Sequence, residues 1–182
     1  MMTEADNDIG GIKIRIREVA QLFNSLDPSP FYQRDLDPEA EEYIVSWARE
    51  VPPDVPMRIV VYLREPADRS TSAHDLAEAL WNYFDQEALL IQRETKELFR
   101  VGRLYLAVGL PVLTVSFIAS HIVRVMLGDG PLSNAVAESL LLVGWVANWK
   151  PIETYLYDWL PLRRKHRLYL RLRDAKVEIV TG

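Results

Sequence analysis

The first half of the sequence holds one loop in which carboxylates, a hydroxyl and a guanidinium lie close together. This loop runs from Leu26 to Asp37, and its candidate binding residues are Asp27, Ser29, Phe31, Arg34 and Asp35. One interpretation is a docking or ligand loop, because loops on a rigid scaffold often carry function. The other is turn chemistry with an ion pair from Arg34 to Asp35 or Asp27, since Asp and Pro are standard turn residues. We favour turn chemistry.

No familiar catalytic or metal-binding pattern is present elsewhere. The histidines, His74, His121 and His166, are far apart in the sequence and lack the spacing of metal ligands. A glycine-rich phosphate loop, a nucleophile elbow and an HExxH pattern are all missing. The chain has no cysteine, which excludes disulfides and thiolate metal sites. We therefore expect no cofactor and no enzymatic activity.

The segment from Leu104 to Val123 is apolar on every side and is bracketed by Arg103 and Arg124. Its length matches the hydrocarbon thickness of a bilayer. A buried core helix is the alternative, but the remaining chain is too short to surround such a helix. We therefore predict a transmembrane helix over residues 104–127.

A second, weaker apolar segment covers residues 132–150. It contains polar residues, among them Asn134, Glu138 and Asn148. The turn signal from Gly128 to Pro131 lies where a hairpin would reverse, and Pro131 suits an early helical position. We predict a second transmembrane helix that Pro151 ends, giving a helical hairpin.

Aromatic residues follow this second segment and are typical of a membrane interface. They are Trp145, Trp149, Tyr155, Tyr157 and Trp159. We expect residues 152–160 to lie along the membrane surface, as amphipathic interfacial segments do.

The net charge is -5, yet basic residues flank both apolar segments. Arg124 alone lies towards the connecting turn, whereas the other positions are Arg100, Arg103, Lys150, Arg163, Arg164, Lys165 and Arg167. Because Lys and Arg favour the cytoplasmic side, both termini are predicted to be cytoplasmic. The same residues would attract anionic lipid headgroups, an explanation we prefer to nucleic-acid binding.

Glu138 is the acidic residue inside the predicted spans, where an unpaired carboxylate costs about 2.5 to 3.5 kcal/mol. Counted from the turn, Glu138 lies level with His121, and Arg124 is one helical turn away. We expect one of them to be its partner. A structural clamp between the helices is preferred to a proton relay.

The rest of the chain predicts an α+β membrane protein with a small cytoplasmic α/β domain of about three strands. Alternating residues indicate a strand near Ile12 to Arg17 and a last one near Val177. The continuous apolar run from Met57 to Arg64 indicates a central strand that is covered on both faces. Helices are predicted over Pro38 to Glu50 and from about residue 73, the latter capped by Ser72 and continuing into the first span. The predicted organisation is a disordered acidic terminus at 1–10, the α/β domain with its stalk helix at 11–103, and an interfacial segment, basic helix and strand at 151–182.

Two stretches resemble small, uncharacterised bacterial two-span membrane proteins known as conserved hypothetical transmembrane proteins. They are Leu22 to Tyr43 (LFNSLDPSPFYQRDLDPEAEEY) and Gly144 to Leu162, with Trp145, Trp149, Lys150, Pro151, Tyr157, Asp158 and Trp159. The resemblance implies a bacterial inner (plasma) membrane and a hairpin, and transfers no catalytic residue.

Three hypotheses for function follow from the sequence. The favoured one is a non-enzymatic membrane adaptor or assembly component that binds a partner protein through its cytoplasmic domain. The second is a subunit of an oligomeric channel or transporter, suggested by Glu138, His121 and Arg124. The third is a membrane-surface enzyme that uses the loop from Asp27 to Asp37.

Overall fold

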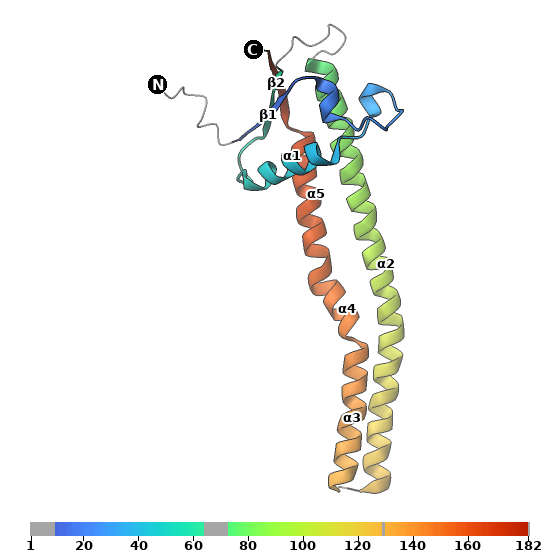
Figure 1. Cartoon of the computed structure of the whole chain (residues 1–182). Helices are drawn as coiled ribbons and strands as arrows, with labels where there is room; N and C mark the ends of the chain where they lie inside the picture. Colours follow the sequence, from blue (N-terminus) through green and yellow to red (C-terminus); the bar gives the residue numbers. More distant parts are fainter. Residues whose placement is uncertain (1–9, 64–72, 129, 182) are drawn as a thin grey trace. The chain divides into compact units, whose positions relative to one another are not determined.

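The computed structural model describes residues 10–63, 73–128 and 130–181 (Figure 1). It is mostly helical and divides into two compact units. The α/β unit comprises Met1–Ile91 and Arg164–Gly182, and the hairpin unit comprises Gln92–Arg163. The predicted disordered terminus and the predicted Ser72 cap lie outside the described residues, apart from Gly10.

The α/β unit contains a three-stranded, fully parallel sheet in the order β1-β2-β3. Its strands are β1 (Gly11–Ile16), β2 (Arg58–Leu63) and β3 (Lys176–Thr181). In register, Ile12 lies beside Ile59, and Ile59 beside Val177. The predictions of three strands, of a central β2 and of a C-terminal strand in the N-terminal sheet are confirmed.

Only one face of this sheet is covered. Ile12, Ile14, Ile59 and Val61 are buried on one side, whereas the alternate residues of β2 are only half-buried. The expectation that β2 is covered on both faces is therefore wrong. Each strand is added on the same side of the strand before it, in the order β1-β2-β3. Right-handed crossovers therefore place the connecting helices on the same face of the sheet.

Helix α1 (Pro38–Glu50) lies between β1 and β2 in the sequence and starts as predicted. The Asp37 carboxylate accepts a hydrogen bond from the Glu39 backbone N–H at 2.9 Å, and Pro38 occupies the first helical position. Its buried residues are Ile44, Val45 and Ala48. Two short 3₁₀ helices, η2 (Val19–Leu22) and η3 (Phe31–Gln33), precede it.

Helix α2 (Ala73–Leu127) is the long continuous helix predicted from the sequence. At helical spacing, α2 buries Leu80, Phe84 and Ile91 in one stripe, but Thr95 and Leu98 further along are only half-buried. The buried stripe thus ends where the α/β unit ends. Phe84 lies edge-to-face on Tyr169 of α5 (Trp159–Arg173), with ring centroids 5.9 Å apart.

In the hairpin unit, α2 runs beside α3 (Pro131–Ala147), as Figure 1 shows. Then follow α4 (Trp149–Glu153) and a π-helical turn, η4 (Thr154–Asp158), before α5. Two predictions fail here. α3 ends at Ala147 rather than near residue 150, and Pro151 does not end a helix. Pro151 lies in the first turn of α4, where its missing N–H breaks no helical hydrogen bond.

We predict that Phe84→Ala destabilises the α/β unit by about 3 to 5 kcal/mol, because it leaves a cavity where α2 meets α5. Trp81→Ala is the matched control, since Trp81 is on the same helix but 47% exposed. It should cost about 1 kcal/mol or less. Hydrogen exchange of the β2 amides in the detergent-solubilised full chain measures the loss. Equal protection in the two variants would contradict the assignment of Phe84 to the core.

Candidate functional site

The hairpin unit has a polar interior. Among the described residues, the buried polar side chains all belong to this unit: Ser116, Ser120, Ser133, Asn148 and Thr154. Buried small residues recur every seven positions along α2, at Gly102, Gly109 and Ser116. This is the spacing at which one helix contacts another along its length. We call the contact between α2 and the returning helices the seam.

The seam brings the helix backbones close together. A Cβ atom added at Gly109 would lie 2.7 Å from the Asn148 Oδ1 atom. One added at Gly144 would lie 2.9 Å from Leu113 Cδ1 and 3.2 Å from Leu113 Cα. Only residues without a side chain fit at such a spacing, a device that is also common in helix pairs of membrane proteins.

Asn148 both ends α3 and joins it to α2. Its backbone N–H donates to the Trp145 carbonyl at 3.0 Å, so the last turn is tightened. Its side-chain amide donates to the Gly144 carbonyl and to the Gly109 carbonyl, both at 2.9 Å. Sequence reasoning counted Asn148 only as a weakness of the second span. The seven-residue spacing of small residues was the signal that could have identified its partner helix.

The outer surface of the hairpin unit is apolar. Exposed large side chains cover α2 and α3: Leu104, Val108, Leu110, Val115, Phe117, Ile118, Ile122, Val125, Leu132, Leu142, Val143 and Val146. The exposed hydroxyls of Thr114 and Ser139 donate to carbonyls four residues earlier in their own helices, each at 2.8 Å. These two hydroxyls are thereby satisfied without water.

The structure does not bring Glu138 together with His121 or Arg124. All three are exposed, and within the described residues no hydrogen bond or ion pair joins them. The reason is rotation: Ala137 is fully buried in the seam, and the next residue of a helix points about 100° away. Asn148 and Ser133, not Glu138, are the polar side chains that link the two helices: the Ser133 hydroxyl donates to the Val123 carbonyl of α2 at 3.5 Å.

The predicted interfacial aromatics are mostly exposed. Trp145, Trp149 and Tyr157 lie on the surface, and Tyr155 packs against Phe99 with ring centroids 5.8 Å apart. The Trp159 Nε1–H donates to the Tyr155 carbonyl at 3.0 Å. Residues 154–158, predicted to lie along a membrane surface, form the turn η4, and Thr154 is buried near Gly102 of α2.

The predicted headgroup-binding residues are all exposed: Arg100, Arg103, Lys150, Arg163, Arg164, Lys165 and Arg167. Arg100 pairs with Glu97 at 3.2 Å, and Lys150 pairs with Glu153 and Asp158, each also at 3.2 Å. Exposed ion pairs of this kind contribute little stability. These cations therefore remain available to anionic groups.

The predicted docking loop is held by its own hydrogen bonds. The Asp27 carboxylate accepts from the Ser29 and Asp35 backbone N–H groups, at 2.9 and 2.8 Å. These bonds, that of Asp35 most of all, lower the pKa of Asp27. Arg34 donates to the Ser29 carbonyl at 3.5 Å and forms no ion pair with Asp27 or Asp35 in the described part of the chain.

The turn-chemistry interpretation of this loop thus agrees with the structure, apart from its ion pair. Phe31 packs on Phe23, with ring centroids 4.9 Å apart. Leu26 stands out at the same loop with 88% of its surface exposed. The loop is therefore fixed in shape and presents the Leu26 side chain to its surroundings.

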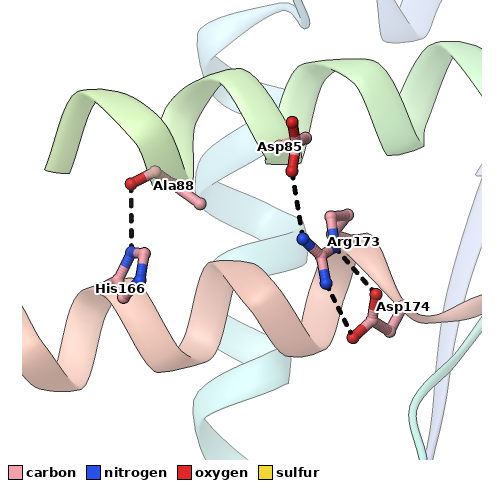
Figure 2. Close-up of polar contacts among 5 residues, drawn as sticks. All are labelled: Asp85, Ala88, His166, Arg173 and Asp174. Atoms are coloured by element: carbon pink, nitrogen blue, oxygen red, sulfur yellow. Dashed lines mark hydrogen bonds and ion pairs between the residues drawn. The ribbon is translucent and has the colours of Figure 1, made fainter. Parts of the chain in front are cut away.

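Polar contacts also hold α2 to α5 within the α/β unit (Figure 2). Arg173 donates to Asp85 at 3.1 Å and to Asp174 at 2.8 Å, and His166 Nδ1 donates to the Ala88 carbonyl at 3.0 Å. Sequence reasoning treated the basic run only as a topology signal. Arg173 and His166 were not predicted to be helix-pairing residues.

A tyrosine cluster lies among the helices of the α/β unit. The Tyr169 hydroxyl donates to the Glu41 carboxylate, and burial followed by this carboxylate raises the pKa of Tyr169. The same two causes raise the pKa of Tyr83, and burial raises that of Glu87. Both tyrosines therefore stay protonated as donors. Tyr169 bonds α5 to α1, and Tyr83 packs from α2 against Phe84 with ring centroids 5.4 Å apart.

One described helix, α2, is long and apolar enough to cross a membrane, while α3 is apolar but shorter, at 17 residues. No family model matches the sequence, and comparisons with curated proteins and with solved structures found no match. The fold and its contacts define the class: a small parallel α/β unit whose last crossover contains an apolar helical hairpin.

Asn148→Leu should destabilise the hairpin by about 1 to 2 kcal/mol, since it removes both bonds of the side-chain amide and leaves the Gly144 carbonyl unsatisfied. Asn134→Leu is the matched control, because Asn134 is exposed on the same helix and its amide makes no bond within the described residues. Unfolding by SDS in mixed micelles measures both. A loss in Asn134→Leu as large as in Asn148→Leu would refute the clamp.

Proposed function

We propose that the protein is an integral membrane protein that crosses a bilayer twice, through α2 and through α3 with the start of α4. One observation carries the proposal: large apolar side chains are exposed along α2 and α3, whereas Ser116, Ser120, Ser133 and Asn148 are buried. In water this arrangement would expose a far larger apolar patch than monomeric proteins tolerate. In lipid it is favourable, because helices there associate through small and polar residues.

The length of the second crossing fits this proposal. α3 spans about 26 Å at 1.5 Å per residue, slightly less than the hydrocarbon core of about 30 Å. The break at Asn148 leaves no bare carbonyl at Gly144, because the side-chain amide bonds it. α4 then continues the crossing. Trp145 and Trp149 are exposed near the end of this crossing, as aromatic residues at a membrane interface are.

We propose that both termini are cytoplasmic. The cations that flank the helices support this, since only Arg124 lies near the connecting turn. The resemblance to bacterial two-span proteins makes the inner membrane the proposed location. Anionic headgroups are the expected lipid partners of the exposed residues from Arg163 to Arg167.

The proposed role is that of a non-enzymatic adaptor or assembly component, whose α/β unit binds a partner protein. Leu26 supports it, because an 88% exposed leucine on a loop of fixed shape is the type of anchor that fills a partner's pocket. The same loop argues against a membrane-surface enzyme. Both oxygens of Asp27 already accept backbone hydrogen bonds, which leaves this carboxylate poorly placed as a base.

A second candidate, a subunit of an oligomeric channel or transporter, is favoured by Glu138. Its carboxylate is exposed on the apolar surface of α3 rather than directed into the seam. In lipid this position costs about 2.5 to 3.5 kcal/mol. A second copy that supplied a polar partner would relieve the cost.

Topology tests the membrane proposal. Reporter fusions at residues 1 and 182 should both report the cytoplasm, and a fusion at residue 129 should report the opposite side. The reason is that two crossings return the chain to the side from which it started. An external C-terminus, or a protein released from membranes by carbonate, would overturn the proposal.

The partner hypothesis predicts that the full chain, purified in mild detergent, retains one stoichiometric protein that Leu26→Asp loses. Leu90→Asp is the matched control, since Leu90 is an exposed leucine of the same unit and should keep the partner. Mass measurement of the complex decides between the candidates. A closed homo-oligomer that Glu138→Leu disperses would instead support the channel subunit.

A further inference from the structure

The carboxyl ends of the parallel strands border a hollow of about 490 Å³ in the α/β unit. Ile16 and Leu63 are the last residues of β1 and β2, and Val180 is near the end of β3. The hollow is also lined by Arg15, Arg17, Gln21 and Tyr62. The volume falls in the range of small-molecule sites, and the carboxyl edge is where parallel sheets most often bind ligands.

The lining is basic. Arg15 belongs to β1 and lies on the sheet face of Lys13, which no helix of the described residues covers. Arg17 follows the end of β1 by one residue, at a bend, and lines the hollow together with Arg15. Neither guanidinium forms an ion pair within the described residues, and none of the described lining residues is acidic. The hollow therefore carries two positive charges that the described part of the fold does not neutralise.

Two neighbouring groups hold the lining in place. Arg15 lies over the ring of Tyr62, its register partner on β2, with the guanidinium carbon 5.9 Å from the ring centroid. The Gln21 Oε1 accepts from the Arg17 backbone N–H at 2.8 Å. This bond fixes the amide group, so its NH₂ end, which has no partner among the described residues, is left to donate.

A peptide strand is the less suitable occupant. On the edge strand β1, the Tyr43 hydroxyl donates to the Lys13 carbonyl at 3.1 Å and so takes one of the backbone acceptors of that edge. Strand addition needs free backbone groups along an edge. The hollow offers instead a cluster of side-chain donors, which suits a compact anion.

We propose that this hollow binds a phosphate monoester. Two guanidiniums, an amide NH₂ and the Tyr62 hydroxyl match a dianion with three acceptor oxygens, and arginine's planar fork suits such oxygens. Tyr62, Leu63 and Val180 supply the apolar surface for the organic part of the molecule. The phosphate belongs either to a soluble metabolite or to the headgroup of a lipid such as phosphatidic acid.

The test uses phenyl phosphate and the full chain in a maltoside detergent, with calorimetry and phosphorus NMR as readouts. Binding should saturate at one site. Arg15→Gln and Arg17→Gln should each weaken it roughly tenfold, the loss expected for a hydrogen bond to a charged group. Arg93→Gln is the matched control, because Arg93 is exposed on α2 outside the α/β unit and should leave affinity unchanged.

Tyr62→Leu should weaken phenyl phosphate more than inorganic phosphate, since it removes the ring as well as the hydroxyl. Vesicles of phosphatidylcholine with phosphatidic acid are then added as competitors. Competition by these vesicles that Arg15→Gln abolishes identifies a lipid headgroup, and its absence identifies a soluble ligand. The absence of saturable binding, or an equal loss in Arg93→Gln, overturns the proposal.

Discussion

The pairing of β3 with β2 is the constraint on which the rest of the chain depends. The two strands are neighbours and parallel, from Arg58 beside Lys176 to Leu63 beside Thr181. All of residues 64–175 therefore form one crossover connection. Because the strands are parallel, this crossover leaves the sheet at the carboxyl end of β2 and must return to the opposite end, where β3 begins. Any excursion of this crossover into a membrane must accordingly contain an even number of crossings.

The helices of the hairpin unit contact one another through different residue types from those of the α/β unit. Phe84 is buried among aromatic and aliphatic side chains, as in a water-soluble core. In the hairpin unit, by contrast, Gly109 and Gly144 allow close backbones and Asn148 supplies hydrogen bonds. One helix, α2, takes part in both kinds of packing. Large apolar residues form its buried stripe up to Ile91, and small residues at seven-residue spacing follow from Gly102. The two units divide between these two stretches, at Gln92.

Local patterns predicted the elements well, because they rest on short-range physics. Alternation identified β1 and β3, a continuous apolar run identified β2, and Asp37 with Pro38 marked the start of α1. The direction in which a helical side chain points was not predictable from these local patterns. A shift of one residue rotates a helical side chain by about 100°, which separates Ala137 in the seam from Glu138 outside it. The uncovered sheet face was missed because strand order, not strand composition, determines it.

The order of synthesis follows from the same connectivity. β1, α1 and β2 emerge first, but β3 and the α5 residues Tyr169 and Leu172, which complete the core, are made after the whole hairpin. Before then, Phe84 has no Tyr169 to pack against, and β2 has a free edge. The α/β unit therefore cannot reach its final stability until α3 has been synthesised. The hairpin can therefore form before the sheet is complete, because Asn148 of the seam is synthesised before Arg173, the partner of Asp85.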